Sequence, residues 1–201
     1  ELVARGHEVT LFATGNSLTS AKLESVFPRG LREAQVEDPY GINPWTILHI
    51  GKAYSRQLEF DVIHDHNSPI SLPTANLASR KVVMTIHSPI NSYYKKLFSA
   101  MTKPYLVGIS KSQIRNAREL NFIQTVYNGL DFNKYSFGKN PDNYLLFIGR
   151  ISPDKGLHLA IEAAKKLSMR LIIAAKIDKV DQEYFKKEIK PHLSKQINLV
   201  G

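Results

Sequence analysis

The sequence contains no cysteine, which excludes disulfide bonds and metal sites built on thiolates. It also lacks any apolar run near the roughly 18 residues that a membrane helix needs. The first residues, 1–5, do not show the basic and then apolar layout of a signal peptide. We therefore expect a cytoplasmic protein.

Acidic residues are fewer than basic ones, with 18 Asp and Glu against 27 Lys and Arg, so the formal net charge is +9. Such a charge attracts phosphates, nucleic acid and acidic lipid headgroups. The basic residues are nevertheless spread along the chain, and doublets such as Lys95-Lys96 are typical of solvated helix faces. Because no block rich in Lys and Arg appears, we expect no nucleic-acid partner.

Short apolar runs alternate with helical patterns along the chain. Most of the runs are continuously apolar, as in strands that are covered on both faces. The predicted strands are residues 9–13, 60–64, 82–86, 105–109, 123–127, 144–148, 171–174 and 197–200. This alternation predicts an α/β fold with two Rossmann-like, doubly wound parallel-sheet domains.

Helix signals lie between these runs. Asn43 before Pro44 predicts an N-cap with proline at the first helical position, and Ser110 with Gln113 matches a capping box. One further helix is predicted by apolar residues at helical spacing, which are Leu157, Ala160, Ile161, Ala164 and Leu167.

A linker is indicated at residues 137–143, where glycine, proline and asparagine gather between two strands. We place the domains at residues 1–138 and 139–201. The chain opens on what resembles a helix tail closed by Gly6, and it ends directly after a strand. We therefore expect both domains to be incomplete: the first without its first strand, the second cut after about three strands. An unpaired sheet edge would then favour self-association.

The sharpest chemical pattern is at residues 147–156, where a strand ends in a turn that opens a helix. Glycine such as Gly149 lets a ligand approach the backbone, and a helix N-terminus attracts anions. Arg150 and Lys155 add two positive charges at the strand end, where open α/β sheets bind ligands. The spacing matches neither the P-loop nor the dinucleotide-binding pattern. From this loop alone, an ordinary turn with two exposed cations is an equal alternative.

Residues 149–156 resemble the G-R-x-x-x-x-K-G signature of family 4 retaining glycosyltransferases. Five other segments resemble the same family in the same order, at residues 5–10, 61–66, 85–88, 108–112 and 127–131. The resemblance covers nearly the whole chain. It implies the GT-B architecture, two Rossmann-like domains with the active site in the cleft between them. It also implies a hexosyltransferase-type enzyme that moves a sugar from a nucleotide-diphosphate sugar, a UDP-sugar among the candidates, to an unknown acceptor with retention.

The resemblance also implies roles for single residues. Arg150 and Lys155 would hold the donor's diphosphate and stabilise the charge that gathers on it as the glycosidic bond breaks. His66 would lie on the acceptor side, and no cofactor or metal is implied. The catalytic residues would be Arg150, Lys155 and His87, and the donor-binding residues Gly149, Arg150, Lys155, Gly156, Ser110 and Ala175. Ala175 stands where relatives often have glycine.

Other interpretations remain open. His87 either faces the donor or fixes the following loop. We interpret His64 and His66 as a hydrogen-bonded structural pair, because two ligands on one strand are too few for a metal. A stripe over residues 93–101 is better explained by core packing than by docking on a membrane, although weak membrane-surface association on the inner face stays open.

Two other functions also remain open. The chain could be a non-catalytic nucleotide- or phosphate-binding module left by truncation, or part of a GT-B enzyme that resembles glycogen synthase. Relatives carry a glutamate pair and a glycine-rich loop that this chain does not contain, so we expect the fragment itself to be inactive.

Overall fold

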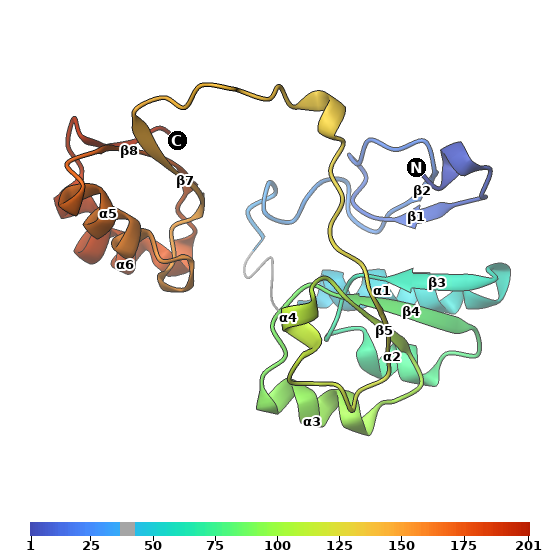
Figure 1. The fold of residues 1–201 in the computed structure, drawn as a ribbon. Coiled ribbons are helices and arrows are strands. Elements are labelled where there is room, and N and C mark those ends of the chain that lie inside the picture. Colours follow the sequence, from blue (N-terminus) through green and yellow to red (C-terminus); the bar gives the residue numbers. More distant parts are fainter. Residues whose placement is uncertain (37–42) are drawn as a thin grey trace. The chain divides into compact units, whose positions relative to one another are not determined.

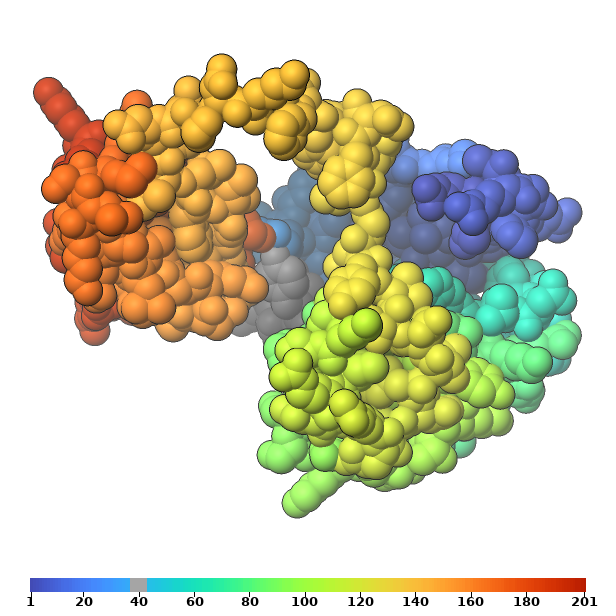
Figure 2. Space-filling view, viewed as in Figure 1, coloured from blue at the N-terminus to red at the C-terminus, as the bar shows by residue number. Residues whose placement is uncertain are grey.

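The computed structural model describes residues 1–36 and 43–201. They form two compact units, Glu1–Leu130 and Asp131–Gly201. The sequence predicts the boundary between residues 138 and 139, a few residues after the boundary in the structure. Both positions lie within residues 126–143, all of which are exposed. Figure 2 shows the part that leads into the second unit as a single thread of atoms.

The first unit contains two separate sheets (Figure 1). One has two strands in the order β1-β2 and the other four in the order β3-β4-β5-β6, and every pair is parallel. The strands are β1 (Thr10–Phe12), β2 (Lys22–Glu24), β3 (Val62–Asp65), β4 (Lys81–Ile86), β5 (Tyr105–Gly108) and β6 (Phe122–Thr125). The expectation of a single sheet here was wrong. Strand β2 was missed because its sequence, Lys-Leu-Glu, has no apolar run.

The two helix starts that the sequence predicts in this unit, at Asn43 and Ser110, are both present in the structure. Asn43 caps α1 by accepting a hydrogen bond from the Thr46 amide at 3.0 Å, and the Ser110 hydroxyl caps α4 by accepting one from Gln113 at 3.1 Å. Gly6 closes the first helical turn with φ at 87°. The helices are η1 (Val3–Arg5), α1 (Pro44–Ser55), η2 (Gln57–Glu59), α2 (Leu72–Leu77), α3 (Ser92–Ala100) and α4 (Lys111–Ile114).

The core of the first unit lies between the four-stranded sheet and its helices. Its buried residues include Ile50, Tyr54, Leu72, Ala75, Val82, Met84, Ile86, Phe98 and Leu106. The apolar stripe of α3 packs here through Phe98, with Tyr94, Leu97 and Met101 partly buried against the same cluster. Tyr93 stands apart, because it is 72% exposed. Core packing therefore accounts for the stripe except at that position.

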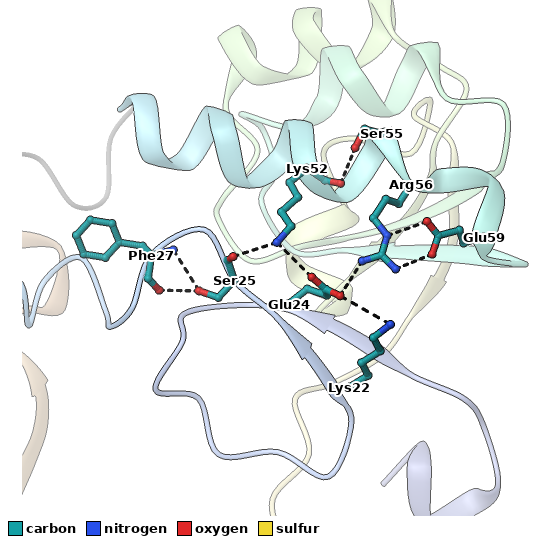
Figure 3. A network of polar contacts seen from close by, with 8 residues as sticks. All are labelled: Lys22, Glu24, Ser25, Phe27, Lys52, Ser55, Arg56 and Glu59. Carbon is teal, nitrogen blue, oxygen red and sulfur yellow. Dashed lines mark hydrogen bonds and ion pairs between the residues drawn. The ribbon is translucent and has the colours of Figure 1, made fainter.

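An ion-pair network attaches the small sheet to helix α1 (Figure 3). The Glu24 carboxylate, at the end of β2, lies 2.8 Å from Arg56 Nη1 and 3.2 Å from Lys52 Nζ. Lys52 Nζ also donates to the Ser25 carbonyl at 3.1 Å, and Arg56 donates twice to Glu59. Ion pairs between the small sheet and α1 thus hold β2 against the helix.

Strands β1 and β3 do not pair with each other. A cavity of about 1600 Å³ is lined by both strands and by α1. Its lining also includes His49, His64 and His66, so the cavity reaches the carboxyl end of β3.

The second unit is a three-stranded parallel sheet in the order β7-β8-β9, the number of strands that the sequence predicts. The strands are β7 (Tyr144–Arg150), β8 (Arg170–Lys176) and β9 (Ile197–Leu199). The helices are η3 (Phe132–Lys134), η4 (Pro153–Lys155), α5 (Leu157–Lys166), η5 (Lys179–Asp181), α6 (Gln182–Tyr184), the π-helical η6 (Phe185–Ile189) and η7 (Lys190–His192).

The core of this unit forms around the predicted stripe of α5. Leu157, Ile161 and Ala164 are at most 1% exposed and pack with Leu171 and Ile173 of β8. The prediction was wrong at Leu167, which is 60% exposed, because the helix ends at Lys166.

These elements establish the fold class. It is α/β, with parallel sheets of the Rossmann-like kind, as the sequence predicts. Within residues 1–36 and 43–201, the helices are too short or too polar to cross a lipid bilayer.

Candidate functional site

The loop after β7 brings the predicted diphosphate-binding residues together. Arg150 is the last residue of β7, Pro153–Lys155 form a single 3-10 turn, and Gly156 leads into α5. The loop is anchored by the buried side chains of Ile151 and Ser152. It therefore has the strand–turn–helix form that the sequence predicts.

Arg150 and Lys155 both contact Asp154. Nη2 of Arg150 lies 3.4 Å from Oδ1 of Asp154, and Nζ of Lys155 lies 3.8 Å from Oδ2. Ser152 donates a hydrogen bond of 2.6 Å to the same carboxylate. This bond, and then the two cations, lower the pKa of Asp154 below its usual range. The two cations thus lie on the same side of the unit, around one carboxylate.

Glycine occurs at position 156 and at position 149 for different reasons. Gly156 has φ at 71°, in the left-handed region that favours glycine. Gly149 has no such requirement, because a Cβ there would meet only the Phe147 ring at 3.7 Å, an ordinary contact. Within the described chain nothing forbids a side chain at 149, which leaves ligand approach as a reason for glycine.

Ala175 lies beside Gly149 on the neighbouring strand β8. Its side chain is 6% exposed and belongs to the core cluster. Any contact with a ligand would therefore have to come from its backbone.

The carboxyl ends of β3 and β4 bring His66 and His87 together. Nδ1 of His66 lies 2.9 Å from Nε2 of His87, and the rings stack with their centroids 5.2 Å apart. The ring centroids of His64 and His66 lie 4.2 Å apart, but His64 forms its hydrogen bond with Thr85 of β4. His64 and His66 are thus both hydrogen-bonded, as expected, but each to a residue of the β4 segment and not to each other.

The surroundings of these histidines disfavour their charged forms. Loss of hydration lowers the pKa of His64, and the charge of His87 lowers it further, while Asp65 acts in the opposite direction. The pKa of His66 is also lowered, first by loss of hydration and then by His64 and His87. Both rings are therefore held in the neutral form at neutral pH.

Asp65 lies between the two histidines in sequence but faces the core, where it is 5% exposed. Its carboxylate accepts hydrogen bonds from the Tyr54 hydroxyl at 2.6 Å, the Asn67 amide at 2.7 Å and the Ser71 hydroxyl at 2.8 Å. Burial and the Asp65 charge raise the pKa of Tyr54. Asp65 thus fixes β3 to α1 and to the start of α2.

Ser110 lies after β5, the next strand of the same sheet. Its helix is tied to the His87 segment through Gln113, whose side-chain amide donates to the carbonyls of Ile86 and Ser88 at 2.8 Å each. The Gln113 carbonyl oxygen accepts from the Ile109 amide, one residue before the Ser110 amide that a capping box would use. Because parallel strands end at one edge, His66, His87 and Ser110 share the carboxyl edge of this sheet.

No group of three or more side chains that could hold a metal occurs in the part of the chain that the structure describes.

Comparison with known families relates this geometry to an enzyme class. Residues 1–134 match the sequence profile of Glycosyltransferase Family 4. The chain belongs to this family. The assignment rests on the first unit, so the match does not depend on the loop around Arg150.

Two other proteins are similar to this chain. A protein of Bacillus subtilis (strain 168) named "Putative glycosyltransferase YtcC" is 28% identical over 152 residues, covering 59% of this chain and 37% of that protein. The crystal structure of AviGT4, described as a glycosyltransferase involved in avilamycin A biosynthesis, matches with a TM-score of 0.61 and 22% identity. This chain spans 37% of the first relative and 52% of the second. The second similarity supports the GT-B fold.

Sequence reasoning missed two acidic residues of this Glycosyltransferase Family 4 chain. Asp154 stands next to Lys155 in the motif, and its charge could have drawn attention to it. Asp181 lies in η5, its carboxylate is 3.5 Å from Arg150 Nε, and no sequence pattern pairs the two.

Proposed function

We propose that the whole protein transfers a sugar from a nucleotide-diphosphate sugar to an acceptor, with retention of configuration at the sugar. The 201-residue chain supplies residues for binding both the donor and the acceptor. The observation that carries the proposal is the convergence of Arg150 and Lys155 on one carboxylate at the start of α5. Two cations beside a helix N-terminus form a favourable place for a diphosphate.

In this proposal Arg150 and Lys155 bind the donor's diphosphate and stabilise it as a leaving group. The negative charge on the diphosphate grows while the bond to the sugar breaks, so fixed cations stabilise the transition state more than the bound donor. Gly149 lets the phosphates approach the backbone, and Gly156 provides the turn that places the first amides of α5.

The first unit would bind the reacting sugar and the acceptor. Its 1600 Å³ cavity reaches His66, which fits the role of His66 on the acceptor side. His87, hydrogen-bonded to His66, would contact the donor sugar or its phosphate, and Ser110 would contribute at the same sheet edge. In the same proposal, the transferred sugar is a hexose and the nucleotide is UDP. The protein is also proposed to be cytoplasmic, to self-associate and to make weak contact with a membrane surface.

The test uses the full-length protein. Nucleotide sugars with different bases and sugars are screened by thermal shift, and those that stabilise the protein are incubated with candidate acceptors. NMR of the product then shows whether the anomeric configuration of the donor is retained. Binding without any transfer to an acceptor would favour a non-catalytic nucleotide-binding module, and an inverted product would contradict the retaining mechanism.

A further inference from the structure

Arg150 lies between two carboxylates that differ in burial. Its Nε is 3.5 Å from Oδ2 of Asp181, which is 6% exposed. Its Nη2 is 3.4 Å from Oδ1 of Asp154, whose side chain is 60% exposed. The guanidinium thus has one buried and one exposed anionic neighbour, on different nitrogens.

The buried neighbour depends on Arg150. A carboxylate removed from water is costly unless a cation or hydrogen bonds compensate it. Oδ2 of Asp181 has no aligned hydrogen bond within the described chain, and Arg150 is the cation at ion-pair distance from it. The next cation on the adjacent strand, Lys176, lies 3.6 Å from a different carboxylate, that of Asp178. Asp181 and Arg150 therefore compensate each other.

The exposed neighbour behaves differently. Asp154 contacts both cations of the loop, one with each carboxylate oxygen. A phosphate group bound by the same cations would present its oxygens in the same way. Exposed ion pairs of this kind are weak, so an incoming anion can replace the carboxylate. Ser152 donates a hydrogen bond to Oδ1 of Asp154, the same oxygen that faces Arg150.

We propose that Asp181 positions Arg150 from the buried side, and that Asp154 lies in the place that a phosphate of the ligand takes over. The inference rests on the proposed function, in which that phosphate belongs to the donor's diphosphate. Asp181 is a positioning residue, because it acts through Arg150. Asp154 lowers the net positive charge of the loop until the ligand arrives.

The two carboxylates then have opposite effects on binding. Asp154→Asn removes a competitor and raises the net charge of the site, so an anion should bind about threefold more tightly. Asp181→Asn keeps the shape but removes the buried charge that attracts Nε of Arg150, so the guanidinium loses its fixed direction and binding should weaken about tenfold.

The experiment measures the affinity of inorganic pyrophosphate for the 201-residue chain by calorimetry. Wild type, Asp154→Asn and Asp181→Asn are compared, each also in an Arg150→Ala background. The effect of Asp181→Asn should disappear in that background, because Asp181 acts through Arg150. The effect of Asp154→Asn should become smaller but persist, because Asp154 also contacts Lys155. A merely structural role of Asp181 would instead weaken binding equally in both backgrounds and would follow the loss of thermal stability.

The outcomes separate this inference from the function on which it rests. If Arg150→Ala binds pyrophosphate as the wild type does, the proposed diphosphate site fails, and this inference with it. If Arg150→Ala weakens binding but Asp154→Asn does not tighten it, or Asp181→Asn leaves it unchanged, only the inference is overturned.

A second measurement does not depend on the Asp181 variant folding. The Nε–Hε NMR signal of Arg150 should have a chemical shift distinct from that of freely rotating arginines, in the wild type and in Asp154→Asn. A signal that is averaged by free rotation in the wild type would overturn the positioning role.

Discussion

His66 and His87 come from successive strands, yet Nδ1 of His66 lies 2.9 Å from Nε2 of His87. In such a pair one nitrogen donates and the other accepts, so the contact couples the tautomers of the two rings. One ring that faces a ligand therefore takes its orientation from the other. This relationship gives the carboxyl edge of the sheet a defined pattern of donors and acceptors.

The lowered pKa values predict how stability depends on pH. The pKa values of His64 and His66 lie below 6.5 in the folded chain and near 6.5 when it is unfolded. The unfolded chain therefore binds more protons in this range, so stability is full above about pH 6.5 and is lost as the pH falls through the folded values. The temperature at the midpoint of thermal unfolding should therefore decrease when the pH is lowered from about 7 to about 5.

The matched control replaces both histidines. A variant with His64→Gln and His66→Gln should show a smaller fall of the midpoint over the same range. His49, whose pKa is also lowered by loss of hydration, accounts for part of what remains. A double variant with an unchanged pH profile would contradict the prediction.

The charges around Glu24 predict a local effect. Glu24→Gln removes the anion shared by Lys52 and Arg56, so the small sheet should separate from α1 more often. Hydrogen exchange should become faster at the amides of β1 and β2 and stay unchanged in β7 and β8. Glu59→Gln, which removes only the other partner of Arg56, is the control and should leave β1 and β2 protected. Equal exchange in both variants would show that the charges do not hold the sheet.

Arg150 should affect turnover more than acceptor binding. In the full-length enzyme, Arg150→Ala should reduce turnover about a hundredfold, or about 3 kcal/mol, because a fixed donor to the leaving group is lost. Arg150→Lys should restore only part, since an ammonium cannot form two parallel hydrogen bonds. Steady-state kinetics of these variants and of Lys155→Ala test this. Wild-type turnover in all three would mean that this loop does not hold the diphosphate.

Substitutions at Gly156 and Gly149 should have different effects, the first on stability and the second on ligand binding. Gly156→Ala forces a side chain into the left-handed region and should destabilise the chain by about 1 kcal/mol. Gly149→Ala makes only an ordinary contact with Phe147 and should fold with nearly unchanged stability, but bind pyrophosphate more weakly. Denaturant unfolding and calorimetry on both variants decide this. Loss of stability at 149 with intact binding would reverse the assignment.

The features that the sequence revealed are those that depend on neighbouring residues. The caps at Asn43 and Ser110 and the apolar stripe of α5 are local patterns, and the structure confirms them. The pair Asn128-Gly129, in contrast, is of a type that favours a tight turn, yet residues 126–130 form none, and neither residue adopts a positive φ. A pair that tolerates a conformation does not have to adopt it.

The site features that the sequence did not reveal depend on distant contacts. The His66–His87 pair requires adjacent strands in one register, and the Arg150–Asp181 pair requires η5 to fold back towards the end of β7. The two residues of such a pair are not separated by any characteristic number of residues in the sequence. The division of the first unit into two sheets was missed for the same reason, because pairing partners are set by the whole packed unit.

Asp65 has a consequence for mutational studies of the histidines. Side chains of a strand alternate between its faces, so shifting β3 by one residue would exchange His64 or His66 with the carboxylate. The Tyr54 and Ser71 hydroxyls, which donate to Asp65 in the core, favour the observed alignment of the strand. Residues behind the sheet, Tyr54 and Ser71 among them, thereby decide which side chains the opposite face displays. A substitution at either could thus be mistaken for a defect in ligand recognition, although it touches no ligand.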